Sequence, residues 1–178
     1  MDTHFYNQIA NSTAHTNCRK DKRDLLLKHP EYLKDLFFIA TLLNDKNHHK
    51  AVWIIEMLAE THIELLLPFI DQICDAAPKY KHQSAIRGIS RMLLLVTTSK
   101  KIMLTEEQKK KCIETSLDRL IGDANSAPKV YAMHTLAHYA QKREWLKVEL
   151  QYIINKDFVH QSAAYKAAAR EVLRRISQ

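Results

Sequence analysis

Apolar residues recur at helical spacing along almost the whole chain, and no segment sustains the strict alternation of a half-buried strand. Breaks at proline, glycine and Asn/Asp clusters divide this pattern into helices. The predicted helices span residues 31–43, 47–60, 62–77, 81–97, 105–121, 127–141, 144–155 and 160–176. Their order predicts four consecutive helix pairs. Residues 1–29, which precede them, are expected to contribute a short capping helix.

One apolar pattern recurs in the second helix of each predicted pair. The four copies read HHKAVWIIEMLA (48–59), HQSAIRGISRML (82–93), SAPKVYAMHTLA (126–137) and HQSAAYKAAARE (160–171). They share positions spaced i, i+3 and i+7, which form the buried stripe of a helix. These positions hold Val52, Ile86, Val130 and Ala164, then Ile55, Ile89, Met133 and Ala167, then Ala59, Leu93, Ala137 and, after a drift, Val172. The repeated His-Gln-Ser-Ala is therefore expected to begin the second helix of repeats two and four.

Helix pairs with this period resemble the HEAT repeat family of α-solenoids. In that family the second helix carries Val-Arg followed by small apolar residues, which Ile86-Arg87 and the alanine run 167–169 match. The resemblance covers about residues 30–178. It implies an all-α fold, an α-solenoid of about four HEAT-like helix pairs, with residues 1–29 as an N-terminal capping segment and residues 30–178 as a single repeat domain.

A narrower resemblance is carried by HHKAVWIIE, SAIRGIS, KVYAMHTL and AAYKAAAREVLRRI. These strings are similar to those of small bacterial HEAT-like proteins of unknown function, some of which carry the label adenylosuccinate lyase. The true lyases are much longer and have a mobile loop rich in serine and glycine with a catalytic serine. No counterpart of that loop is found in 178 residues with 2 glycines, so lyase activity is not expected.

Composition narrows the classes of function further. With 2 glycines the chain has neither a GxGxxG motif nor a P-loop, which disfavours glycine-loop nucleotide binding. Its 3 cysteines are far apart and odd in number, so neither a disulfide framework nor a cysteine metal knuckle is indicated. The sequence shows no export signal and no apolar run long enough for a membrane span. We expect a reducing, cytoplasmic setting, no membrane partner and no cofactor.

The positive charge of the chain is unevenly distributed. Residues 1–89 hold 11 Lys and Arg and 11 Asp and Glu, whereas residues 90–178 hold 16 and 9. The whole excess of +7 therefore lies in the second half. Such a field attracts an acidic protein segment or a nucleic acid, although it equally suits a solvated surface that aids solubility.

A ladder of aromatic and arginine side chains is predicted beside the buried stripe. It comprises Trp53, Arg87, Arg91, Tyr131 and Tyr165. In three repeats an aromatic residue stands where the HEAT family usually has arginine. These residue types dominate protein contacts and can also stack on bases. The ladder is read either as a binding surface or as packing between repeats.

A basic stripe is predicted on the last helix. Lys166, Arg170 and Arg174 recur at every fourth position, and Arg175 adjoins them. The stripe suits phosphates or an acidic peptide. It also suits the polar outer face that caps a solenoid, with cations near a helix C-terminus.

Two further spacings carry candidate chemistry. His134 and His138 lie one turn apart, but a glutamate of the HExxH type and a third ligand are not evident, so ordinary helical histidines are the favoured reading over a metal site. Glu56, Glu60 and Glu64 offer either a solvated face or a carboxylate to a pocket beside Trp53. No catalytic residue is assigned.

Two functions are carried forward from the sequence. The first is a non-enzymatic interaction module that binds a protein or peptide segment on the inner surface of a short HEAT-like solenoid. The alternative is nucleic-acid binding through the basic C-terminal half, in the manner of HEAT-like DNA glycosylases, which rests on fold analogy and charge.

Overall fold

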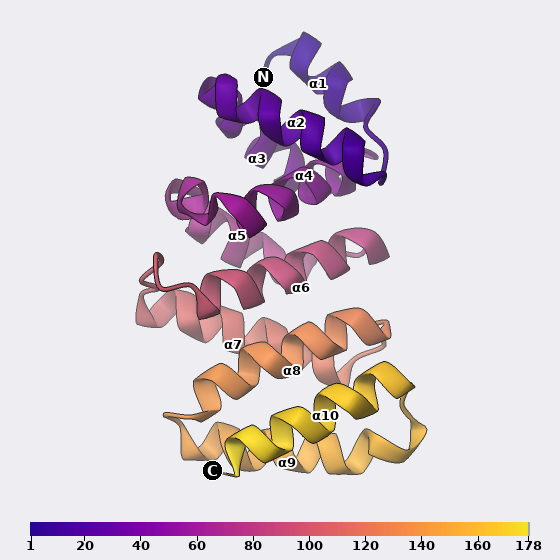
Figure 1. Ribbon diagram of the computed structural model, residues 1–178, viewed down its shortest axis with the longest axis vertical. Helices are drawn as coiled ribbons and strands as arrows, with labels where there is room; N and C mark the ends of the chain where they lie inside the picture. Colours follow the sequence, from indigo (N-terminus) through magenta and orange to yellow (C-terminus); the bar gives the residue numbers. More distant parts are fainter. Residues whose placement is uncertain (178) are drawn as a thin grey trace. The chain divides into compact units, whose positions relative to one another are not determined.

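The computed structural model describes residues 1–177, and this part of the chain is all-helical, without strands, as predicted (Figure 1). The α-helices are α1 (Thr3–Ala10), α2 (Thr16–Lys28), α3 (Leu33–Thr41), α4 (His48–Thr61), α5 (Ile70–Ala76), α6 (Gln83–Thr98), α7 (Glu106–Ile121), α8 (Ser126–Ala140), α9 (Glu144–Asp157) and α10 (Ala163–Ile176). Short 3-10 segments are η1 (Pro30–Tyr32), η2 (Ile63–Phe69), η3 (Ala77–Lys79) and η4 (Phe158–His160). Within residues 1–177, no helix is both long and apolar enough to cross a bilayer.

Two segments differ from the predicted helices. The segment 1–29 holds two helices instead of one, because Asp2 caps α1 by accepting a hydrogen bond from the Phe5 amide, and Phe5 and Ile9 bury one face. The predicted helix 62–77 is a 3-10 segment followed by α5. Pro68 lies inside that 3-10 segment and cannot donate the backbone hydrogen bond that an α-helix needs there.

The chain forms two compact units, Met1–Met92 and Leu93–Gln178, and their border falls within α6. In the first unit α2 and α3 both pack against α4, and α1 contacts α3 and α4 (Figure 1). Stacked aromatic rings support this packing: Phe5 lies 4.6 Å from Tyr32 and Phe37 lies 4.0 Å from Phe69, measured between ring centroids. Helix α4 is therefore the central element of the first unit.

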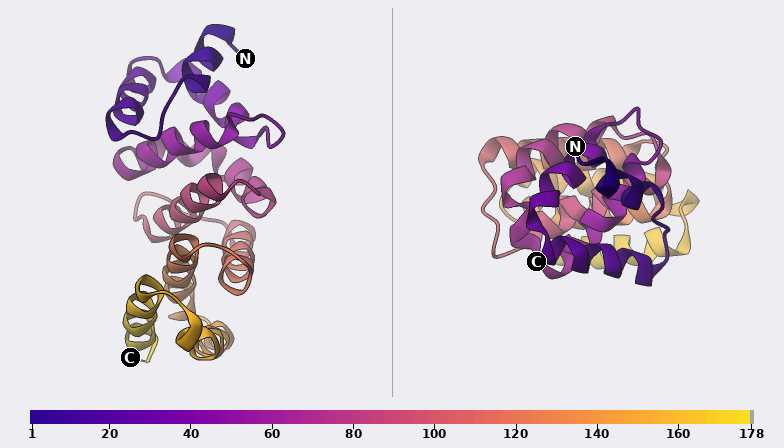
Figure 2. Two further views of the ribbon diagram at one scale, coloured as in Figure 1. Left: turned by 90° about the vertical axis from the view of Figure 1, so that its right-hand side faces the viewer. Right: turned by 90° about the horizontal axis from the view of Figure 1, so that it is seen from above.

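In the second unit the helices form two layers. Helices α7 and α9 lie on one side, and α8 and α10 lie on the other (Figure 2). Helix α8 packs against α7, α9 and α10 and is the most deeply placed element of this unit. Its buried Tyr139 shares a hydrogen bond of 3.0 Å with Thr97 at the end of α6.

The buried stripe is placed as predicted in the first three repeats, with one partial exception. Ile86, Ile89, Leu93, Met133 and Ala137 are each at most 5% exposed, whereas Val130 is half-buried. In the fourth repeat the predicted register is wrong by one residue. Ala164 and Ala167 are exposed, and the buried side of α10 consists of Tyr165, Ala168, Ala169, Val172 and Ile176.

The two copies of His-Gln-Ser-Ala adopt different conformations, which explains this shift. In the copy at 82–85, helix α6 already begins at Gln83. In the copy at 160–163, His160 ends a 3-10 turn, Gln161 is extended, and Ser162 is the N-cap whose side chain accepts from the Tyr165 amide. The second copy therefore enters its helix two residues later, and the gap-free alignment places the wrong side chains in the core.

Replacing Ile89 by Ala tests the placement of the buried stripe. Ile89 is 3% exposed, so the truncation should lower the free energy of unfolding by about 2–5 kcal/mol, as core deletions of this size do. Urea denaturation followed by circular dichroism measures the change. Leu67→Ala, at a position that is 49% exposed, is the matched control and should have a small effect. Equal effects of the two substitutions would contradict the placement.

Candidate binding site

The carboxylate of Glu56 is the most deeply buried charged group of the first unit, with 0% exposure on α4. Arg87 of α6 binds it through two parallel hydrogen bonds, from Nη1 to Oε1 at 3.0 Å and from Nη2 to Oε2 at 2.7 Å. Arg91 donates to the same carboxylate at 3.4 Å and forms an ion pair with Glu60 at 3.0 Å. Arg19 of α2 approaches Glu56 to 3.9 Å. We call these five residues the arginine cluster.

The register of the cluster follows from two matching spacings. Glu56 and Glu60 lie one turn apart on α4, and Arg87 and Arg91 lie one turn apart on α6. Side chains four residues apart on a helix share one face, so Arg87 meets Glu56, and Arg91, one turn further along, meets both Glu56 and Glu60. The equal spacing of opposite charges on two helices could have indicated these ion pairs from the sequence, but the sequence analysis did not use it.

Gly88 permits the close approach of the two helices. A Cβ atom at this position would lie 2.7 Å from Cγ1 of Val52, a separation that packed atoms do not adopt. The same atom would lie 3.5 Å from Oε2 of Glu56. One of the 2 glycines of the chain is therefore required where α6 passes over α4, directly beside the arginine that binds Glu56.

The geometry decides what Glu56 can do. Both of its oxygens accept hydrogen bonds from guanidinium groups, and neither is exposed, so the side chain acts as an anchor for arginines and not as a base for a substrate. The Arg87 and Arg91 side chains remain 34% and 37% exposed. The exposed parts of these two guanidinium side chains bring positive charge to the surface of the first unit.

A second cluster, of histidines, lies at the N-terminal ends of α4 and α6. The rings of His49 and His82 stack at 4.0 Å, and His48 meets His82 edge-on at 5.8 Å. Trp53 packs against His49 and donates its indole N–H to Ser84 Oγ. Desolvation, followed by the charges of His82, His48 and Lys50, lowers the pKa of His49 to about 4.

The predicted ladder is only partly assembled as a surface. Trp53, Arg87 and Arg91 lie on neighbouring helices of the first unit, and Tyr131 is half-buried on α8. Tyr165 is wrong as a binding residue, because its side chain is 0% exposed in the core of the second unit. Its burial follows from the later start of α10, and it raises the pKa of its hydroxyl to about 12. Sequence reasoning missed Arg19, which joins the arginine cluster from outside the repeats.

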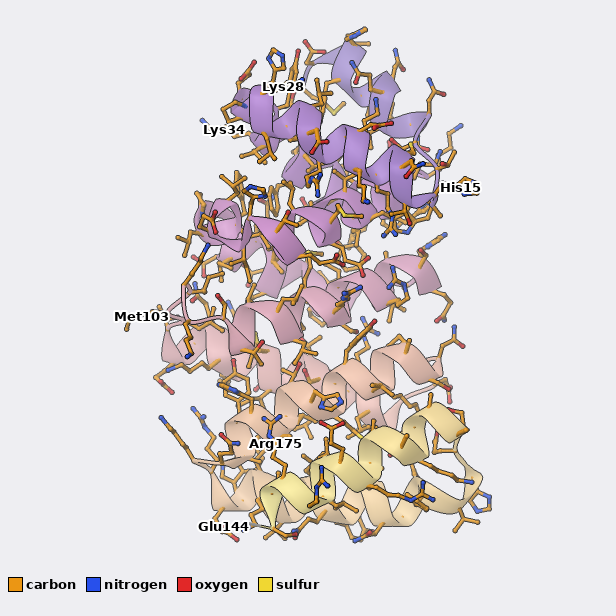
Figure 3. The ribbon with its side chains drawn as sticks, viewed as in Figure 1. His15, Lys28, Lys34, Met103, Glu144 and Arg175 are labelled. Atoms are coloured by element: carbon orange, nitrogen blue, oxygen red, sulfur yellow. The ribbon has the colours of Figure 1, made fainter. Side chains whose placement is uncertain are left out.

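The residues of the predicted basic stripe lie on two sides of α10. Arg170 and Arg174 are exposed and Lys166 is half-buried. The Arg170 guanidinium group lies 5.4 Å from the centre of the Phe158 ring. Arg175 lies on the side of α10 that faces α8, as Figure 3 shows, and its charge lowers the pKa of His138 after the larger effect of desolvation.

The remaining sequence candidates do not form a site. Desolvation lowers the pKa of His134, and a nearby Glu171 opposes this shift. Within residues 1–177 no group of three or more His, Cys, Asp or Glu side chains is placed to hold a metal ion. Comparison with known protein families, with characterised proteins and with solved structures finds no match for this chain.

Replacing Glu56 by Gln tests the arginine cluster. The change keeps the shape of the side chain but leaves Arg87 and Arg91 without their shared counter-charge. The free energy of unfolding should therefore fall by about 3–5 kcal/mol, as for other buried pairs that lose one partner. Chemical denaturation provides the measurement. Glu107→Gln, whose side chain is 66% exposed and 3.8 Å from Lys111, should change the stability by less than about 0.5 kcal/mol. A value for Glu56→Gln no larger than that of the control would contradict the anchoring role.

The histidine cluster predicts a pH dependence of stability. The pKa of His49 is about 4 in the folded chain and about 6.5 when unfolded, so the unfolded chain binds the proton more readily between these values. Stability should consequently be lost as the pH falls from about 6.5 towards 4. His49→Phe, which keeps a ring against His82, should reduce this slope.

The measurement is urea denaturation at a series of pH values. His4→Phe, at an exposed position of α1, is the control and should keep the wild-type slope. A His49→Phe variant with the wild-type slope would show that other groups cause the pH dependence.

Proposed function

We propose that this chain is a non-enzymatic interaction module that binds an acidic protein segment at Arg87 and Arg91. The observation that carries the proposal is the buried Glu56, which holds both guanidinium groups while about a third of each arginine side chain stays exposed. An arginine pair fixed in this way presents its charge at low entropic cost, because the side chains are already ordered before a partner arrives.

The chemistry of arginine favours carboxylates as the ligand. A guanidinium group has five N–H donors in a planar fork, so it can bind a buried carboxylate with one edge while another part contacts a partner. Glu60, whose side chain is 30% exposed, pairs with Arg91 at the same surface. An extended segment with Asp or Glu side chains carries the charge opposite to that of the exposed guanidinium groups.

The proposal includes a HEAT-like repeat architecture. Its support is the recurrence of one buried pattern on α4, α6 and α8, and the later start of α10 accounts for the shifted fourth copy. HEAT-like repeats use such second helices as binding surfaces. The three cysteines are odd in number and far apart in the sequence, which favours a reducing, cytoplasmic setting for the module.

Fluorescence anisotropy with labelled peptides tests the proposal. A peptide rich in Asp and Glu should bind the wild-type chain. Its affinity should fall as the salt concentration rises, because the contact is between exposed charges. Arg91→Gln should reduce the affinity by about tenfold or more, in the range of a lost charged contact. A neutral peptide of equal length is the ligand control.

Substitutions in the basic stripe provide a control for Arg91→Gln, and they also test the alternative of nucleic-acid binding. Exchanging Lys166, Arg170 and Arg174 for Glu should leave acidic-peptide binding within about twofold if the arginine pair is the site, since the exchanged residues are not part of it. A DNA duplex that binds at low salt and is released by this triple exchange would instead favour nucleic-acid binding through α10. No binding of acidic peptides to the folded wild-type chain would reject the proposal.

A further inference from the structure

Helix α9 carries a row of large apolar side chains on its solvent face. Trp145, Val148 and Tyr152 are 58%, 58% and 61% exposed, and Val159 in the following η4 is 72% exposed. The opposite face of the helix is already packed, through Leu146, Leu150, Ile153 and Ile154. The exposed apolar residues are therefore not needed to pack α9 against the rest of the second unit.

The spacing of this row is that of a coiled-coil seam. Trp145, Val148 and Tyr152 occupy successive a, d and a positions of α9, and the polar Asn155 takes the next d position, whereas Val159 lies beyond the end of α9 in η4. A polar side chain at one such position is a known device for fixing the register of paired helices. Between α7 and the start of α9, Trp145 also borders a groove of about 400 Å³ that includes Ile113 and Leu117, which widens the apolar surface.

Charges beside the seam distinguish the possible orientations of a second α9. Glu149 and Lys156 lie on one flank, seven residues or one heptad apart, and both are exposed. Glu144, at the start of α9, takes a g position and therefore lies on the other flank. In an antiparallel pair like flanks meet, so Glu149 faces Lys156 of the partner subunit twice. In a parallel pair Glu144 would instead face Glu149 of the partner subunit, and like charges repel.

We propose that two copies of this chain associate through α9, antiparallel about a two-fold axis near Tyr152. The Tyr152 rings lie close to the axis, Val148 packs toward Val159 of the partner subunit, and two Glu149–Lys156 pairs flank the contact. The surface is self-complementary, as an isologous two-fold interface must be. Antiparallel helix dipoles add to the preference.

The available area indicates a weak, reversible dimer. Each copy contributes two aromatic side chains of a kind that buries roughly 150–250 Å² when fully enclosed, and the 58% and 61% of them that is exposed is available to the contact. Together with the two valines, both copies approach the roughly 1,000 Å² that a specific interface requires. Association is therefore expected in the micromolar range, which concentration-dependent methods resolve.

Sedimentation velocity of the full chain over a range of concentrations tests the dimer. The wild-type chain should shift from monomer to dimer as the concentration rises. Tyr152→Lys should remain a monomer throughout, because two lysine charges would meet at the axis. Met103→Lys, at a position that is 93% exposed in the link between α6 and α7 (Figure 3), should dimerise like the wild type.

Charge exchange tests the antiparallel orientation. Glu149→Lys and Lys156→Glu should each weaken the dimer several-fold, and the double exchange should restore the wild-type affinity. Circular dichroism should show unchanged helix content in all variants, since the substituted residues are exposed. A parallel seam would give the opposite sign for Glu149→Lys, because the substitution would remove a repulsion with Glu144.

Two results would overturn the proposal. One is a wild-type chain that stays monomeric up to submillimolar concentration. The other is a dimer that Tyr152→Lys and the charge exchanges leave unaffected, which would place the contact elsewhere on the molecule.

Discussion

Removing the carboxylate of Glu56 from water costs several kcal/mol, and only close cationic partners can offset this cost. Arg87 does so with two short hydrogen bonds, and Arg91 and Arg19 lie on the remaining sides of the carboxylate. The cluster joins α2, α4 and α6, so a single buried charge links three helices. Arg87 and Arg91 are partly exposed, so the interaction that stabilises the first unit also holds two arginine side chains at the surface of that unit.

The helix backbone has to accommodate this interaction. Glycine inside a helix costs about 1 kcal/mol relative to alanine, because it restricts a more flexible unfolded chain. Gly88 lies in the middle of α6 nonetheless, since any Cβ atom there would meet Val52. The local preference of the chain is thus overruled by the approach that Arg87 needs to reach Glu56. A residue that appears unfavourable in one helix is favourable once the neighbouring helix is considered.

The helices could be predicted from the sequence because each buries one stripe, and a stripe is visible as a period in the residues. The site could be predicted only in part. Arg87 and Arg91 could be predicted from their position beside the buried stripe of α6. Their pairing with Glu56 and Glu60 could not, because it depends on the distance between two helices, and the spacing of residues along one helix does not reveal that distance. Arg19 comes from a segment without a repeat. Tyr165 was misplaced because identical tetrapeptides enter their helices differently, and the preceding 3-10 turn at Phe158–His160 makes that difference.

The two proposed surfaces rely on different forces, which allows them to be separated in one protein. Contacts at Arg87 and Arg91 depend on exposed charge, so screening over about 8–10 Å at physiological salt weakens them strongly. The α9 seam depends chiefly on burying Trp145, Tyr152 and valine side chains, and apolar burial is little affected by moderate salt. Rising salt therefore removes the electrostatic partner first and leaves the α9 contact, apart from its flanking Glu149–Lys156 pairs. The two proposals together imply a chain that holds a copy of itself while it exchanges an acidic partner.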